Sequence, residues 1–199
     1  ILIVCSSLFS FRGRRHFKVK TKPKFPLRQL LTISFLLFFC FVPRITHEDL
    51  LTPDGKLSLF NIHTNELLNI SYLNKAGQVD QAAISSISYL LRCPDTNEVH
   101  AIDPKLILML DRVQDYFGKD KTVDIVCGYR SPYYNQLLRS RSEGVARFSY
   151  HMKGEAVDID IPNTSLSEMY HYAWALHQGG VGFYPDKFIH IDIGPVRWW

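Results

Sequence analysis

The sequence predicts an α+β domain in which helices pack on a mainly antiparallel sheet. Apolar residues with helical spacing dominate residues 80–141, whereas alternating or continuous apolar segments cluster after residue 155. Helices and strands that fall in separate stretches are typical of this class, because parallel sheets alternate the two. No repeat, low-complexity tract or linker interrupts residues 44–199, so we expect a single domain there.

The first elements are a hairpin and two helices. Residues 57–62 and 67–73 alternate apolar and polar side chains around a short turn at residues 63–65, which is typical of paired strands. Residues 80–91 and 104–117 carry apolar residues three and four apart, as amphipathic helices do. Asp103 and Pro104 suit the N-terminus of the second helix.

The later elements alternate between short strands and helices. We expect strands at residues 123–127, 155–161, 180–183 and 188–193, and helices at residues 132–141 and 166–177. Cys93 and Cys127 are the only cysteines after residue 44. They would form one disulfide in an oxidising compartment or remain two buried thiols, and the sequence leaves both open.

Charge is unevenly distributed along the chain. Eight of the 23 Lys and Arg residues precede residue 44, and none of the 19 Asp and Glu residues does. The remaining chain therefore has a net charge of −4, although the whole chain has +4. This distribution predicts that the domain has no nucleic-acid partner.

Residues 1–43 have the organisation of an export segment. A basic stretch precedes an apolar run at residues 30–42, LLTISFLLFFCFV, which ends before Pro43. The run is shorter than the roughly 20 residues that a spanning helix needs, and the order of the two parts is that of a secretory signal. No small-residue cleavage site follows. A cleaved signal and an uncleaved membrane tether therefore both remain open.

The residues with metal-binding chemistry lie in the last third of the chain. Asp158 and Asp160 share one face of an expected strand, because side chains alternate along a strand. His190 and Asp192 share one face of another. If these strands are neighbours, Asp158 and His190 can reach one ion, with His151 from the preceding turn as third ligand. Two imidazoles and a carboxylate are common at catalytic zinc, and they also suit iron, cobalt or nickel.

The same region carries a family resemblance. The pattern Ser149-x-His151-x-x-Gly154-x-Ala156-x-Asp158, followed by His190-x-Asp192, resembles the zinc signature of the D-alanyl-D-alanine carboxypeptidases and other LAS-type metallopeptidases. Within that clan the chain is similar to the bacterial murein endopeptidases of the YcbK group. Further matching segments are residues 57–64 (LSLFNIHT), 128–131 (GYRS), 139–147 (RSRSEGVAR), 179–185 (GGVGFYP) and 194–197 (GPVR).

The resemblance implies a LAS or hedgehog-like sheet that carries a Zn²⁺ site with His151, Asp158 and His190 as ligands. It also implies an exported enzyme of the periplasm or cell envelope that cuts peptide cross-links in peptidoglycan. One position departs from the wider clan, because Lys187 stands three residues before the last ligand, where several relatives have an acidic general base. We expect Asp192 to act as the base, or to orient a ligand imidazole instead. Asp186 and Asp160 are further candidates for these two roles.

Substrate recognition should need a cation, because peptidoglycan stems carry carboxylates. Arg130 follows a strand end and is the candidate for this cation, since a guanidinium binds carboxylates in a planar, bidentate manner. We therefore expect Arg130 both to bind the substrate and to belong to the catalytic residues together with Asp192. Ser149 is expected to supply a hydroxyl to the substrate.

The alternative functions are a catalytically silent, zinc-stabilised wall-binding domain, which the missing base favours, and a carboxypeptidase that releases a terminal D-amino acid. The oligomeric state is left open.

Overall fold

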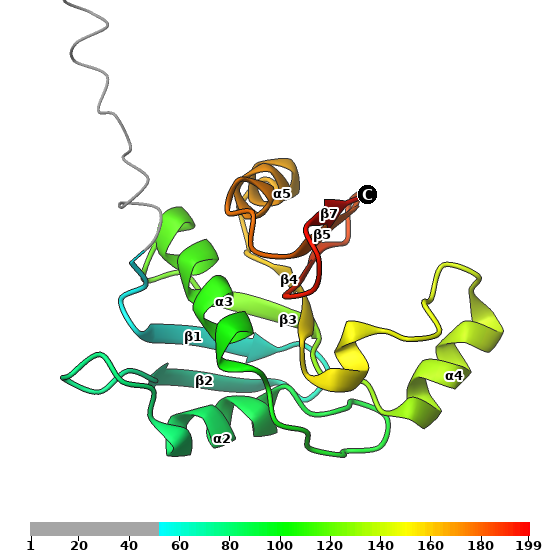
Figure 1. Ribbon diagram of the computed structural model, residues 1–199, viewed down its shortest axis with the longest axis horizontal. Coiled ribbons are helices and arrows are strands. Elements are labelled where there is room, and N and C mark those ends of the chain that lie inside the picture. Colours follow the sequence, from blue (N-terminus) through cyan, green and yellow to red (C-terminus); the bar gives the residue numbers. More distant parts are fainter. Residues whose placement is uncertain (1–51) are drawn as a thin grey trace, which may run out of the picture. The chain divides into compact units, whose positions relative to one another are not determined.

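The computed structural model describes residues 52–199, which fold into a seven-stranded sheet with helices around it (Figure 1). The expected export segment, including the apolar run at residues 30–42, lies outside the described residues. Among residues 52–199, no helix combines the length and the hydropathy that crossing a bilayer requires.

The strands form one sheet in the order β2-β1-β3-β4-β6-β5-β7. All the strands that the sequence predicts are present, and β7 is an addition at the edge of the sheet. Their bounds are β1 Lys56–Asn61, β2 Glu66–Ser71, β3 Val123–Cys127, β4 Ala156–Asp160, β5 Gly180–Tyr184, β6 Phe188–Asp192 and β7 Arg197–Trp198.

The sheet is mixed, which corrects the expected mainly antiparallel sheet. Strands β1 and β3 are parallel, because the chain between them crosses over through two helices. Strand β7 also runs parallel to its neighbour β5. Antiparallel pairing holds for β1 with β2 and through the series β3-β4-β6-β5. The periodicity of each segment defines the strands but not the direction of their partners.

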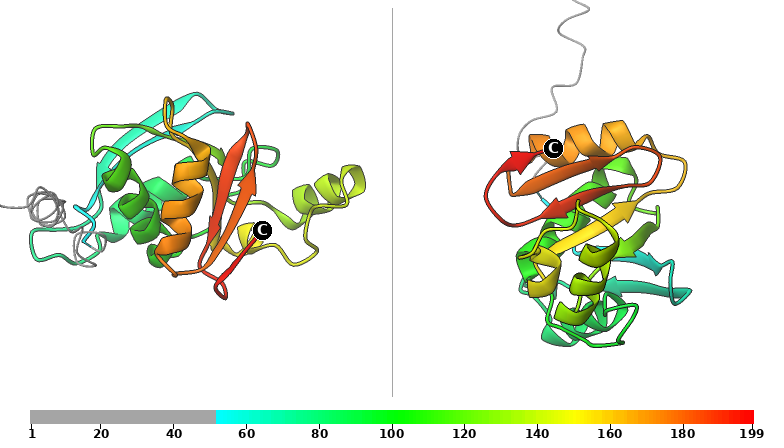
Figure 2. Two further views of the ribbon diagram at one scale, coloured as in Figure 1. Left: turned by 90° about the horizontal axis from the view of Figure 1, so that it is seen from above. Right: turned by 90° about the vertical axis from the view of Figure 1, so that its right-hand side faces the viewer.

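The helices follow the sequence prediction closely. The side chain of Asp80 caps α2 and that of Asp103 caps α3, each by accepting a hydrogen bond from a backbone N–H group. Pro104 is the first residue of α3. Helix α5 lies alongside β5 and β6, and α4 projects from the body (Figure 2). The helices are α2 Gln81–Leu90, α3 Pro104–Phe117, α4 Pro132–Arg141 and α5 Leu166–Ala175, and a 3₁₀ turn, η1, spans Tyr150–Lys153.

Alternation in β4 and β6 separates the core from the polar side chains. Ile159, Ile189 and Ile191 are fully buried in the core cluster together with residues of α2, α3 and α5. Asp158 and His190 therefore lie on the other face of the sheet. On that face the neighbouring element is η1, which contacts β4. The apolar residues thus build the core, and their neighbours in sequence build a polar site.

Cys93 and Cys127 are both free thiols. Of the two alternatives that the sequence leaves open, the structure therefore has the unpaired cysteines. Cys93 is buried in the core, whereas Cys127 is only partly buried at the end of β3.

Candidate active site

Four residues form a row across four adjacent strands. Cys127 of β3 pairs with Asp158 of β4, Asp158 pairs with His190 of β6, and His190 pairs with Gly182 of β5. Residues that are directly opposite each other in a sheet present their side chains on the same face. The row therefore brings a thiol, a carboxylate and an imidazole together, and it ends at a residue without a side chain.

A β-bulge in β3 places Cys127 in this row. Ile125 pairs with Ile159, but the next paired residue is Cys127, opposite Asp158, so Val126 is the extra residue. A bulge of this kind reverses the alternation along the strand. Without it, Val126 would lie opposite Asp158.

His151 approaches the row from η1. Ser149 caps this turn by accepting the His151 N–H at 3.4 Å, and Gly154 ends it in the left-handed conformation with φ 70°. A Cβ at Gly154 would collide with the backbone oxygen of Ala101. Glycine is therefore required where the chain turns from η1 into β4.

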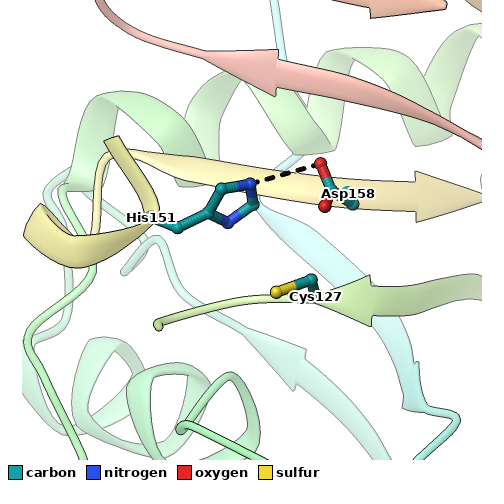
Figure 3. A group of neighbouring side chains, drawn as sticks. All are labelled: Cys127, His151 and Asp158. Carbon is teal, nitrogen blue, oxygen red and sulfur yellow. Dashed lines mark ion pairs between the residues drawn. The ribbon is translucent and has the colours of Figure 1, made fainter. Parts of the chain in front are cut away.

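Three donor atoms converge between η1, β4 and β6. His151 Nε2 lies 3.2 Å from Asp158 Oδ1 and 3.2 Å from His190 Nδ1, and the last two atoms are 2.8 Å apart. Figure 3 shows His151 directed at Asp158, with Cys127 beside them. All three donor residues are buried.

The two 3.2 Å separations match those expected around a single tetrahedral ion, whereas the 2.8 Å separation between Asp158 Oδ1 and His190 Nδ1 is shorter. Zinc bonds to nitrogen and oxygen are about 2.0–2.2 Å long, so adjacent ligands of a tetrahedral site lie about 3.3 Å apart. The other nitrogen of each imidazole is already used, since His151 Nδ1 lies 2.8 Å from the Gly128 carbonyl and His190 Nε2 lies 2.9 Å from Asp192 Oδ2. These partners direct the remaining nitrogen of each ring towards the donor cluster. The residues therefore fit the zinc ion that the resemblance implies.

The donor cluster attracts positive charge. Burial alone would lower the pKa of His151, but the adjacent Asp158 and Cys127 together outweigh burial and raise this pKa to about 10. Burial likewise opposes ionisation of Asp158, but His151 and His190 hold the pKa of this carboxyl well below its usual range. A cation bound between these groups would replace protons that the cluster otherwise holds.

Asp192 is fully buried behind His190. Its Oδ2 accepts hydrogen bonds from His190 Nε2 and, at 2.6 Å, from Arg197. Its Oδ1 accepts hydrogen bonds from the backbone N–H groups of Gly180 and Gly194. Burial raises the pKa of Asp192, but these hydrogen bonds prevail and lower it to about 2. The carboxylate faces the side of the imidazole away from Nδ1. This geometry favours the orienting role over that of general base.

The cluster opens into a cleft of about 440 Å³. Arg130 lines this cleft with its Nη2 3.5 Å from Asp158 Oδ2, and its buried Nε has no hydrogen-bond partner. Ser149 also lines the cleft while it caps η1. Asp192 is not among the lining residues. Asp186 is exposed in the turn between β5 and β6 and does not line the cleft either.

Comparison with known proteins identifies the family. The family model described as peptidoglycan L,D-endopeptidase MepK, Peptidase_M15_2, matches residues 52–199. The chain belongs to the Peptidase_M15_2 family. This confirms the resemblance to the murein endopeptidases of the LAS-type zinc peptidase group.

Curated relatives of this Peptidase_M15_2 chain carry the same description. Peptidoglycan L,D-endopeptidase MepK of Escherichia coli strain K12 is 37% identical over 175 residues, which cover 86% of this chain and 96% of that protein. The probable peptidoglycan L,D-endopeptidase MepK of Haemophilus influenzae is 39% identical over 151 residues, which cover 74% of this chain and 81% of that protein.

Sequence reasoning misses two residues of this Peptidase_M15_2 site. It offers Cys127 only as half of a disulfide or as a buried thiol, because a bulge leaves no signal in the alternation of β3. Trp199 lines the cleft, but nothing in its sequence context indicates that a strand at the sheet edge carries it there. Alternation predicts which face of its strand carries Asp158 and which carries His190. Their proximity depends on the pairing of β4 with β6, which the structure shows.

Proposed function

We propose that this chain is an exported, zinc-dependent peptidase that hydrolyses peptide cross-links of peptidoglycan. The observation that carries the proposal is the convergence of His151 Nε2, Asp158 Oδ1 and His190 Nδ1 within 3.2 Å of one another at a cleft. The family adds the reaction class, because its members are peptidases.

In this proposal His151, Asp158 and His190 bind the zinc ion. When bound, zinc would act as a Lewis acid that activates water and polarises the scissile carbonyl. The protein's own contribution is to hold the donors in place. The Gly128 carbonyl fixes the tautomer of His151, and Asp192 fixes that of His190. We therefore assign Asp192 to positioning rather than to proton transfer.

Arg130 is proposed to bind a substrate carboxylate. It is mostly buried, it lines the cleft, and its Nε has no partner. An unpaired N–H on a buried guanidinium is costly, and a bidentate carboxylate would satisfy it. Ser149 borders the same cleft and is proposed to contact the peptide while it caps η1.

The bond is proposed to be an L,D peptide bond, because the names of both relatives specify it. A D-alanyl-diaminopimelate cross-link joins two D centres. A diaminopimelate-diaminopimelate cross-link joins an L centre to a D centre, so it is the bond of this class.

Residues 1–43 are proposed to direct the domain at residues 44–199 to the periplasm or cell envelope, where the substrate lies. The basic stretch and the apolar run at residues 30–42 support export. A cleaved signal and a retained membrane tether both accommodate this location.

The test is incubation of purified cross-linked muropeptides with the full chain in detergent, zinc-loaded or chelated, followed by mass spectrometry. We expect zinc-dependent conversion of diaminopimelate-linked dimers to monomers. His151→Ala should abolish zinc binding and turnover, whereas the matched control His171→Ala, on the exposed face of α5, should retain both.

Different products would redirect the proposal. Loss of only a terminal residue would identify a carboxypeptidase. A folded, zinc-loaded protein that binds sacculi but releases no product from either cross-link would overturn the peptidase and identify a wall-binding domain.

A further inference from the structure

One side of the cleft, next to His190, is an aromatic wall. It consists of Tyr184, Phe188 and Trp199, which all line the cleft. The Trp199 ring centroid lies 5.3 Å from that of His190, and the residue remains 47% exposed. Arg197 also lines the cleft, with its guanidinium carbon 5.1 Å from the centre of the Trp199 ring, and its charge is paired with Asp192. The wall therefore offers the cleft mainly apolar ring surface.

Trp199 is held in a defined position. Its backbone N–H donates to the Val181 carbonyl at 3.2 Å, and its carbonyl accepts from the Phe183 N–H at 2.9 Å. Its indole Nε1 donates to the Tyr184 hydroxyl at 3.2 Å. Figure 1 shows the strand that precedes it, β7, at the side of β5. Both backbone and side chain thus fix the indole relative to β5.

Gly182 provides the space for this indole. It is the last residue of the row that contains Asp158 and His190, and a Cβ there would lie 2.6 Å from a ring carbon of Trp199. Its φ is outside the left-handed region, so the backbone itself does not need glycine. The requirement comes from the indole, which occupies the position of the missing side chain beside His190.

The adjacent Trp198 provides a contrast. It packs against Trp174 of α5, with ring centroids 5.7 Å apart, and does not line the cleft. The two adjacent tryptophans therefore lie on opposite faces of the sheet. A half-exposed aromatic ring that is fixed in a cleft loses little entropy when a ligand covers it.

We propose that Trp199, seated on Gly182, is the substrate-positioning wall of the cleft and packs against the aliphatic chain of the cross-linked residue on one side of the scissile bond. This inference rests on the proposed peptidase function. The methylene chain of diaminopimelate is apolar and suits an uncharged ring surface. Its carboxylates suit Arg130, which lines the same cleft.

The test compares the full chain with Trp199→Ala, Gly182→Ala and Trp199→Phe, and uses Trp198→Ala as the matched control. Steady-state kinetics on diaminopimelate-linked dimers are combined with zinc content, circular dichroism and calorimetric binding of the same dimers to chelated protein. We expect Trp199→Ala and Gly182→Ala to raise KM about tenfold with kcat nearly unchanged. The reason is that the ring contacts the substrate equally in the ground state and in the transition state, so its loss weakens binding but not the chemical step. Trp199→Phe and Trp198→Ala should remain within about threefold of the parent.

The outcomes distinguish a substrate-positioning wall from a support for His190. Unchanged KM and unchanged dimer binding in folded Trp199→Ala would overturn the wall. Loss of zinc with a fall in kcat would also overturn it, because Trp199 would then support His190 instead. If neither the parent nor any variant cleaves dimers but binding to the chelated protein still depends on Trp199, the peptidase proposal fails, and Trp199 is a binding surface for the cross-linked residue.

Discussion

Asp192 contacts His190 on the side opposite Nδ1, the nitrogen that faces His151 and Asp158. The carboxylate is fully buried and accepts hydrogen bonds from the imidazole, from Arg197 and from two backbone N–H groups. A carboxylate partner increases the basicity of a ligand imidazole and fixes its tautomer. At the scale of single residues, this contact determines which nitrogen of His190 can bind an ion.

Asp192→Asn should therefore weaken zinc binding. The amide oxygen can still accept from His190 Nε2, but the negative charge is lost, so we expect the zinc affinity to fall about 10- to 100-fold. Competition with a chromophoric chelator measures this change.

The matched control is Asp160→Asn in β4, because Asp160 Oδ1 accepts only from the backbone N–H of Ile161. It should leave the zinc affinity unchanged. Parent-like zinc affinity in folded Asp192→Asn would contradict the positioning role.

At the scale of elements, α3 anchors the hairpin through a buried carboxyl. Asp111 Oδ2 accepts two hydrogen bonds from the hairpin of β1 and β2. The Tyr72 hydroxyl, just after β2, donates one at 2.7 Å, and the Gly55 N–H, just before β1, donates the other at 2.9 Å. Its Oδ1 has no partner. Burial raises the pKa of Asp111 to about 6; the Tyr72 hydrogen bond opposes the rise and the nearby Asp115 adds to it.

The raised pKa predicts a pH-dependent stability. The folded state retains a proton that the unfolded chain has lost above the ordinary pKa of 3.8. The free energy of unfolding should therefore decrease as pH rises from about 4 to about 6, by at most about 3 kcal/mol. Urea unfolding at a series of pH values measures it.

Asp111→Asn should flatten this profile, because the amide oxygen can accept the same two hydrogen bonds without titrating. Asp120→Asn, an exposed position after α3, is the control and should keep the parent profile. An identical slope in the parent and in Asp111→Asn would refute the assignment to this residue.

At the scale of the whole molecule, the donor cluster joins segments that are distant in sequence. His151 comes from η1, Asp158 from β4 and His190 from β6, and a fixed turn at Gly154 connects the first two. An ion held by all three segments would bind the folded state and not the unfolded chain. Binding of this kind adds to the stability of the entire domain.

Zinc should consequently raise the melting temperature. At a free concentration about 100 times the Kd, binding contributes about 2.7 kcal/mol, which for a domain of this size corresponds to roughly 5–10 °C. Differential scanning calorimetry with zinc and with chelator measures the difference. His190→Ala should abolish it, and His171→Ala should preserve it. A zinc effect that persists in His190→Ala would show that the ion binds elsewhere.

The sequence by itself predicted the four helices of residues 52–199 and every strand there except β7, and it named His151, Asp158 and His190 as candidate metal ligands. Helical spacing, the Asp103 cap and strand alternation depend on contacts within each segment or on the polarity of its two faces. Alternation also placed Asp158 and Asp160 on one face of their strand, and His190 and Asp192 on one face of another strand. The pattern that resembles the zinc signature of LAS-type metallopeptidases then added His151 as the third candidate ligand.

Only the tertiary structure decided how the strands pair and what surrounds the donors. The parallel pairs β1-β3 and β5-β7 depend on how the connections cross the sheet, which no local pattern records. The bulge at Val126 reverses the side-chain alternation and brings Cys127 beside Asp158. Trp199 reaches His190 because β7 pairs with β5 and Gly182 leaves room for the indole. These features arise from contacts between distant segments, so they exist only once the sheet has formed.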